Sequence, residues 1–353
     1  MVLALGIVGV TLPARAQAPP GEGLFGHLFT SKGEIVIRLA FVRTPMTVAN
    51  FVGLAEGTIA NDAFPPRTPF FDGTTFHRVV PGHVIQGGIP ASERARGSGR
   101  TIPNEIDRTL SHDHAGAVGM ANGGPHTATN QFYVTLGDRS YLDGDYAVFG
   151  DVVLGLDVAM RIERDDRIDS VRIVRVGDDA TAFRPTTESF LAMVDRVGAR
   201  VTAAEQRHRA DDAAFVSRRW PEAVATDSGW QYVIIEPGAG QPVGVGDTVL
   251  VSYTGRTVSG LQFAGTGNDG APSWLPVAGA DLPFAYVVGS NAITRGFDAA
   301  VTTMRHGEKR LVIVPAALAY GTSGYYAPSR EGERRFVISP NTMLIYEITL
   351  RPD

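Results

Sequence analysis

The stretch Phe76–Gly88 (FHRVVPGHVIQGG) limits the possible folds of this chain more than any other. Apolar residues alternate with polar ones on both sides of Pro81-Gly82, and two glycines end the run. This pattern predicts a strand, a turn and a strand, with Arg78 and Gln86 together on the face opposite the apolar side chains. A lone arginine of this kind is more often a surface residue of an edge strand, because a buried unpaired donor costs about 1–3 kcal/mol. The segments downstream decide between the two interpretations.

Four further segments follow in order: Met120-Ala121-Asn122, Asn130–Thr135, Tyr141–Gly144 and Val148–Gly150. With Phe76–Gly88 they resemble the cyclophilins, and the resemblance extends from about Leu24 to Val176. It implies a closed eight-stranded antiparallel barrel capped by two helices, with peptidyl-prolyl cis–trans isomerase activity. We therefore expect a first domain at residues 24–178, in which Arg78 is functional.

Local patterns place the elements of this domain. Alternation of apolar and polar residues predicts the strands. A proline at the first helical position and a closing glycine mark a helix. The predicted elements are strands at 24–30, 34–39 and 171–176 and helices at 44–57 and 154–162.

Two polar segments are predicted to be loops. Glu93–Arg108 contains glycine and charged residues, which favours an exposed loop. His112 and His114 flank Asp113 and could suggest a metal site, but two histidines without a further ligand are a weak signal. We interpret them as part of a solvated loop and predict no metal and no cofactor.

Residues 181–221 differ from the first domain in their residue pattern and are predicted to form a helical linker. Thr187 and Glu188 start a pattern of spaced apolar residues, and a charged run follows up to Trp220-Pro221. The pattern fits one or two helices.

A second domain is predicted at residues 226–353. Its ordered segments are VSYTG from Val251, TRGF from Thr294, GEKR from Gly307, LAYG from Leu318 and ISPNT from Ile338. They resemble the FKBP-type isomerases from about Gly229 to Pro352, which implies a twisted sheet around one short helix. The whole chain thus resembles a mainly β, two-domain dual-family immunophilin.

Proline isomerisation explains why such sites need few chemical groups. Rotation about a peptide bond meets a barrier of about 18–20 kcal/mol, because amide resonance must be broken. A catalyst needs an apolar pocket for the proline ring and a donor aimed at the prolyl nitrogen, whose lone pair is exposed only in the twisted state. Arginine suits this role because its guanidinium stays charged.

The cyclophilin resemblance assigns roles in the first domain. Arg78 is the donor held by Gln86, the Asn122 backbone binds the substrate chain, and Gln131 orients the carbonyl side. The residues expected to bind the proline segment are Val84, Tyr133 and Leu142 in the pocket, Tyr141 and Tyr146 at its rim, and His83 and Ala121.

Three of these positions depart from the commonest family pattern. His83 replaces an apolar aromatic residue, Tyr141 replaces a frequent tryptophan, and Tyr146 replaces a frequent histidine. Tyr141 lacks an indole donor, so we expect weaker cyclosporin-type binding. Taken singly, these aromatic residues would be interpreted as ordinary core packing.

The FKBP resemblance assigns an aromatic pocket in the second domain, formed by Tyr253, Phe263, Phe284, Ile293, Thr294, Phe297, Tyr320 and Tyr346. Ala264 replaces a usual acidic residue, and Phe297 replaces the tryptophan of the pocket floor. An insertion at Gly265–Leu282 and a longer loop near Glu331–Arg335 change the rim. We expect reduced catalysis here, with proline-segment binding in a chaperone-like role as the alternative.

Composition narrows the partners and the location. A net charge of −5 gives no general basic surface, so nucleic acid is not expected, and no apolar run reaches the ~20 residues that span a bilayer. Proline-containing unfolded or partly folded polypeptides are the expected partners, and the oligomeric state stays open. Residues 1–18 combine an apolar run from Val2 with Ala16-Gln17-Ala18, which predicts a cleaved signal peptide and export to a bacterial periplasm or cell envelope.

Overall fold

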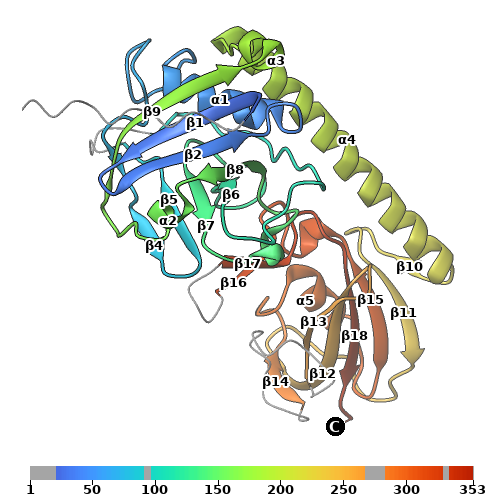
Figure 1. The fold of residues 1–353 in the computed structure, drawn as a ribbon. Helices are drawn as coiled ribbons and strands as arrows, with labels where there is room; N and C mark the ends of the chain where they lie inside the picture. Colours follow the sequence, from blue (N-terminus) through green and yellow to red (C-terminus); the bar gives the residue numbers. More distant parts are fainter. Residues whose placement is uncertain (1–20, 91–96, 267–282, 329–333, 353) are drawn as a thin grey trace, which may run out of the picture. The chain divides into compact units, whose positions relative to one another are not determined.

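The computed structural model describes residues 21–90, 97–266, 283–328 and 334–352, and these form a mainly β protein (Figure 1). The chain divides into two compact units, Met1–Val201 and Thr202–Asp353. Each unit has its own hydrophobic core and its own sheet.

The first unit begins with a hairpin and contains nine strands. The strands are β1 (Gly23–Thr30), β2 (Gly33–Leu39), β3 (Thr74–Thr75), β4 (Arg78–Val80), β5 (Val84–Gly87), β6 (Ala117–Met120), β7 (Phe132–Thr135), β8 (Val148–Leu154) and β9 (Arg167–Val176). The helices are α1 (Pro45–Glu56), the 3₁₀ helix η1 (Ser140–Leu142), α2 (Leu156–Ala159) and α3 (Asp178–Ala182), and α4 (Thr187–Arg219) begins in this unit and continues past its boundary at Val201. The predicted hairpin, first helix and closing strand are confirmed.

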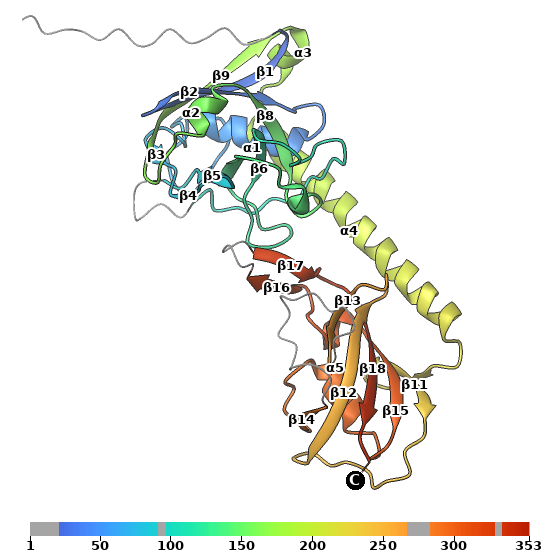
Figure 2. The ribbon, with the colours of Figure 1, turned by 60° about the horizontal axis from the view of Figure 1, so that its bottom comes forward.

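The nine strands form one antiparallel sheet in the order β3-β9-β1-β2-β8-β6-β7-β5-β4. The sheet curls, and α1 lies against it (Figures 1 and 2). The curled antiparallel sheet agrees with the expected cyclophilin-like fold, but the closed eight-stranded barrel does not match it. The sheet has nine strands, with β3 and β4 as its two edge strands. An isolated bridge between Thr75 and Ile89 links β3 to the segment after β5.

Helix α1 is held inside this sheet by its apolar residues. Pro45 occupies the first turn, and Gly57 ends the helix in the left-handed conformation with φ 67°. Val48, Phe51 and Val52 are fully buried in the core of the unit. The residue before the helix is Thr44, and its hydroxyl does not cap the helix.

Two sequence-based expectations are wrong in detail. The second helix is limited to Leu156–Ala159, because β8 continues through Leu154 and pairs there with Val36. In the predicted loop Glu93–Arg108, residues 91–96 lie outside the described part. Asn104 and Glu105 of the same loop are buried rather than exposed.

Residues 187–219 form one continuous helix, α4. Phe190 and Val197 near its start are buried in the core of the first unit. Beyond residue 201 the helix is mostly exposed and rich in charged residues. No helix within the described ranges is long and apolar enough to cross a membrane.

The second unit is a sheet packed against one short helix. The strands are β10 (Val224–Ala225), β11 (Gln231–Glu236), β12 (Thr248–Thr257), β13 (Gln262–Gly265), β14 (Phe284–Val287), β15 (Lys309–Val314), β16 (Tyr325–Pro328), β17 (Arg334–Ile338) and β18 (Leu344–Leu350). The main sheet has the order β10-β11-β15-β18-β12-β13 with β14 paired to β12, and β16 pairs with β17. Helix α5 (Arg295–Val301) packs its buried residues into this core, and η2 (Ala316–Leu318) follows β15.

Candidate active site

The hairpin β4–β5 places Arg78 directly across from Gln86. Their Cα atoms are partners in the antiparallel register, with Val79 opposite Ile85 at the next position. Cross-strand partners project to the same face of a sheet, so Arg78 and Gln86 share one face and the apolar pair takes the other. The predicted placement of the two polar side chains is confirmed, and both are half-buried.

Gln131 joins this pair through its side chain and its backbone. The Gln86 side-chain amide donates to Gln131 Oε1 at 2.9 Å. The backbone N–H of Ala121 donates to the Gln131 carbonyl at 2.9 Å. Asn122 follows, and its own amide donates to the Asp145 carbonyl at 2.9 Å. All four predicted catalytic residues therefore lie in one connected part of the first unit.

The predicted proline-binding residues form a small apolar cluster separate from the main core. Val84, Tyr133 and Leu142 are its buried members, and Ala121, Tyr141 and Tyr146 pack against them. We call these six residues the Tyr133 cluster. Gln86 is the register partner of Tyr133 in the β5–β7 pair, which brings the polar residues and the cluster to adjoining positions.

His83 lies at the edge of this cluster and is buried. Its Nε2 atom lies 2.6 Å from the Tyr141 hydroxyl, and the two rings are nearly parallel with centroids 6.3 Å apart. The substitution of an aromatic residue by His83 is thus matched by the replacement of tryptophan by Tyr141. Each polar group satisfies the other.

His77 is a site residue that sequence reasoning missed. Burial lowers its pKa, and a hydrogen bond with the Gln131 side chain opposes this effect. The positive charge of Arg78 lowers the pKa of His77 further. The feature of the sequence that could have identified His77 is its position directly before Arg78.

His112 is the second missed residue, and its assignment to a solvated loop is wrong. Its side chain is fully buried, whereas the side chain of His114 is 50% exposed. His112 Nε2 lies 2.7 Å from the Tyr133 hydroxyl, and its Nδ1 lies 2.6 Å from Asp143 Oδ1. Burial lowers the pKa of His112 and raises the pKa of Tyr133 well above its usual value.

Two hollows are lined by predicted site residues. One of about 400 Å³ is lined by Gln131 and Asn130, together with residues 97–101 and 89–90. Another of about 490 Å³ is lined by Tyr146, Asp143 and Arg108, among others. The first hollow adjoins Gln131, and the second adjoins the Tyr133 cluster at Tyr146.

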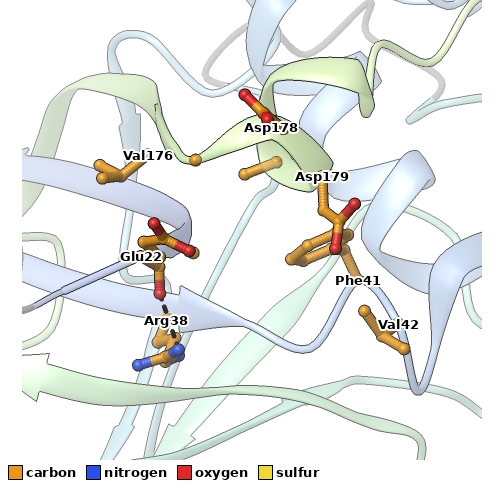
Figure 3. A pocket seen from close by; sticks show the side chains of 10 residues that line it. Glu22, Arg38, Phe41, Val42, Val176, Asp178 and Asp179 are labelled. Atoms are coloured by element: carbon orange, nitrogen blue, oxygen red, sulfur yellow. Dashed lines mark hydrogen bonds between the residues drawn. The ribbon is translucent and has the colours of Figure 1, made fainter.

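A third cavity, of about 580 Å³, lies where β1 begins and β9 ends (Figure 3). Glu22, Arg38 and Asp179 line it, and Arg38 donates to the Glu22 carbonyl at 2.8 Å. It contains none of the predicted site residues.

The predicted aromatic residues of the second unit also come together. Tyr253 contacts Phe284, Phe297 and Tyr346 with ring centroids 5.2–6.2 Å apart. Phe263 and Phe297 contact Tyr346 at 5.8 and 5.3 Å. Ile293 and Tyr320 pack against the same core from partly exposed positions. We call these seven residues the Tyr253 cluster.

The polar groups of the Tyr253 cluster are hydroxyls. Burial raises the pKa of Tyr253 to about 12, and the charge of Tyr320 adds to this shift. The Tyr346 hydroxyl is buried without a hydrogen-bond partner in the described part of the chain, with Thr294 nearby. Thr294 caps α5 by accepting from the Phe297 N–H at 3.2 Å.

Ala264 packs beside the Tyr253 cluster without any polar atom on its side chain. Most of the predicted insertion, from residue 267 onward, lies outside the described residues. Residues 331–333 of the predicted rim loop near Glu331–Arg335 also lie outside them, and its last two residues, Arg334 and Arg335, belong to strand β17 instead of a loop.

Two family models match the chain. The cyclophilin type peptidyl-prolyl cis-trans isomerase family matches residues 27–178, and the FKBP-type peptidyl-prolyl cis-trans isomerase family matches residues 240–351. The order of the two agrees with the order of the two units.

Curated relatives resemble the first part of the chain. Peptidyl-prolyl cis-trans isomerase A of Mycobacterium tuberculosis is 41% identical over 130 residues, which are 36% of this chain and 71% of the relative. Peptidyl-prolyl cis-trans isomerase ppi1 of Schizosaccharomyces pombe is 40% identical over 139 residues, which are 38% of this chain and 83% of the relative. A crystal structure of a cyclophilin type isomerase from Cryptosporidium parvum is 24% identical, with a TM-score of 0.38 over 43% of this chain and 98% of that one.

Proposed function

Because this chain belongs to the peptidyl-prolyl cis-trans isomerases, with a cyclophilin-type part followed by an FKBP-type part, we propose that it assists protein folding by rotating X-Pro bonds. Arg78 and the Tyr133 cluster form the main catalytic site in this proposal. The substrates are proline-containing segments of unfolded or partly folded polypeptides, since uncatalysed X-Pro exchange is slow enough to limit folding.

The proposed chemistry follows from the twisted state of the X-Pro bond. When the amide twists, resonance is lost and the prolyl nitrogen gains a lone pair that can accept a hydrogen bond. The Arg78 guanidinium donates to that nitrogen, while the ring of the proline rests on the Tyr133 cluster. The interaction is strong only in the twisted state, so it lowers the barrier rather than merely binding the substrate.

The observation that carries the proposal is the placement of Arg78 across from Gln86, whose side-chain amide donates to Gln131. Gln86 is the direct neighbour of Arg78, and its amide is fixed by Gln131. Gln131 therefore limits the position of the Gln86 side chain, which shares a sheet face with Arg78. The Asn122 backbone lies beside them for the chain of the substrate, next to Ala121, whose N–H donates to the Gln131 carbonyl.

The test is Arg78→Ala in the full chain, with cis–trans exchange of a short X-Pro peptide measured by NMR. Removal of one preorganised donor typically costs about 10²–10³-fold in rate, so kcat/KM should fall to the level that the FKBP-type part supplies. Arg161→Ala is the matched control, since Arg161 is 60% exposed and its ion pair with Asp157 contains no predicted site residue. Near-normal exchange in the Arg78→Ala chain, with the fold retained, would refute the mechanism.

We assign the FKBP-type part a weaker catalytic role on the same class of segments. The Tyr253 cluster provides an apolar surface for proline, and its polar groups are hydroxyls rather than a charged side chain. A chaperone-like role, in which this part binds but hardly catalyses, is supported by Ala264 at the usual acidic position.

We also propose that the protein is exported to the periplasm or cell envelope. The support is the apolar run from Val2 to Leu12, followed by Ala16-Gln17-Ala18. Residues 1–20 lie outside the described part of the structure.

A further inference from the structure

A chain of hydrogen bonds runs from an exposed carboxylate through a buried histidine to Tyr133, the buried tyrosine of the Tyr133 cluster. Asp143 is 37% exposed, and its Oδ1 atom lies 2.6 Å from His112 Nδ1 and accepts from the His112 backbone N–H at 2.9 Å. His112 is 0% exposed, and its Nε2 lies 2.7 Å from the Tyr133 hydroxyl. Three residues from separate segments are thereby joined.

The direction of the two hydrogen bonds follows from the donors available. An ionised carboxylate can only accept, so His112 Nδ1 carries the hydrogen that faces Asp143. Burial favours the neutral ring by lowering the pKa of His112. Nε2 is then an acceptor, and the Tyr133 hydroxyl donates to it. Asp143 thus fixes the His112 tautomer, and His112 fixes the Tyr133 hydroxyl.

The strand next to Tyr133 makes room for the same hydroxyl. Gly119 on β6 is the register partner of Tyr133 on β7. A Cβ atom at position 119 would lie 2.4 Å from the hydroxyl oxygen, well inside van der Waals contact. Only glycine fits there while the tyrosine keeps this position.

The ring of Tyr133 is also held on two sides. The His112 ring stacks against it with centroids 5.9 Å apart at 19°, and Tyr146 meets it edge-on at 6.0 Å and 81°. The ring is 4% exposed and adjoins Val84 and Leu142.

We propose that Asp143, His112 and Tyr133 form a positioning relay that fixes the wall of the proline-binding surface and thereby sets substrate affinity. His112 and Asp143 are positioning residues, because they act through Tyr133. The Tyr133 ring contacts the proline ring when the X-Pro bond is cis, trans or twisted. It therefore stabilises these three states of the substrate to a similar extent. The relay therefore affects KM and leaves kcat nearly unchanged.

The proposal rests on the proposed isomerase function, and the Arg78→Ala chain separates the two. If Arg78→Ala abolishes most of the exchange and the relay variants change nothing, only the relay is wrong. If Arg78→Ala changes nothing, the isomerase site itself is wrong. The residual rate of the Arg78→Ala chain also gives the background to subtract.

The experiment compares Tyr133→Phe, His112→Leu and the double variant in the full chain, with kcat and KM determined on one X-Pro peptide. We expect each single variant to raise KM about 5- to 20-fold, with kcat within about twofold, since a relay of this kind supplies part of the ring's contact energy. The double variant should match the worse single variant, because both changes interrupt the same relay. His114→Gln is the matched control: it changes an exposed histidine of the same loop that also pairs with two aspartates, and it should leave both constants unchanged.

Unchanged KM in the folded Tyr133→Phe chain would overturn the proposal. Multiplicative effects of the two substitutions would also overturn it, because His112 would then act by another route. If His112→Leu fails to fold, Asp143→Asn takes its place. Asparagine still accepts from the His112 backbone but holds the ring nitrogen less strongly, so a smaller rise in KM supports the relay and no rise counts against it.

Discussion

Arg78 lies on a three-residue strand directly across from Gln86, and the Gln86 amide donates to Gln131. Arg78 thus shares a sheet face with an amide that is itself held by a hydrogen bond, and it stays half-buried. The Tyr253 cluster has no comparable arrangement among its described members, whose polar atoms are the hydroxyls of Tyr253, Tyr320 and Tyr346. The two parts of the chain therefore offer different chemistry to the same kind of bond.

At this scale we predict that Ala264→Asp activates the FKBP-type part. A carboxylate beside the Tyr253 cluster can accept hydrogen bonds that alanine cannot, and such charge-assisted bonds contribute about 1.5–3 kcal/mol. Each 1.36 kcal/mol is about tenfold in rate, so kcat/KM should rise about 10- to 100-fold. The measurement is peptide exchange by the full chain carrying Arg78→Ala, with and without Ala264→Asp.

The control for this prediction is peptide affinity measured on the same two chains. No increase in exchange, in a chain that still binds the peptide, would show that the carboxylate has no place in this pocket.

Helix α1 shows how an element depends on a distant side chain. Glu105 is 5% exposed and accepts from the Thr47 N–H at 2.8 Å and from the Thr47 hydroxyl at 3.0 Å. It therefore satisfies an orphan N–H in the first turn of α1, where the Thr44 side chain does not. Burial raises the pKa of Glu105, and the hydrogen bonds from Thr47 only partly oppose that shift.

We predict that Glu105→Ala destabilises the N-terminal end of α1. The Thr47 N–H loses its acceptor in a buried position, which costs about 1–3 kcal/mol. Glu105→Gln keeps an acceptor and is the matched control. Hydrogen exchange of peptides from residues 45–56 should become faster in Glu105→Ala and change little in Glu105→Gln; equal rates in all three proteins would contradict this role.

Glu105 also gives a prediction of pH dependence. Its folded-state pKa is raised, so the stability it contributes is full below the unfolded pKa and is lost as the pH rises through the folded pKa. The wild type should therefore lose stability relative to Glu105→Gln as the pH rises through that range. Denaturant unfolding at several pH values from about 4 to 7 measures it, and parallel curves for the two proteins would count against a raised pKa.

At the scale of the whole molecule, two units with separate cores carry two matches to isomerase families. Helix α4 contributes Phe190 and Val197 to the first core and continues beyond the boundary between the units. The chain thus carries two separate groups of predicted site residues, which differ in their polar groups.

We predict that the protein isolated from its native cells begins near Pro19. Ala16-Gln17-Ala18 after the apolar run is a cleavage signature. Mass spectrometry of the native protein gives the N-terminus. Retention of residues 1–18 on a cytoplasmic species would contradict export, and Ala18→Asp should block the cut if the assignment is correct.

The sequence by itself determined the local elements and their order. The hairpin β4–β5, the start of α1 at Pro45 and its end at Gly57 depend on alternation, proline and glycine, which act within a few residues. The family resemblance then placed Arg78, Gln86 and Gln131 together, and the register and hydrogen bond agree with that placement.

Only the tertiary structure decided which polar side chains are buried. The buried His112 has its hydrogen-bond partner in Tyr133, 21 positions away. The buried Glu105 has its partner in Thr47, 58 positions away. Both lie in segments whose composition predicts exposed loops, because local composition does not report distant partners. Burial of a polar group is tolerated energetically only when the folded chain supplies a hydrogen-bond partner. The role of such a group therefore follows from the assembled site and not from its neighbours in sequence.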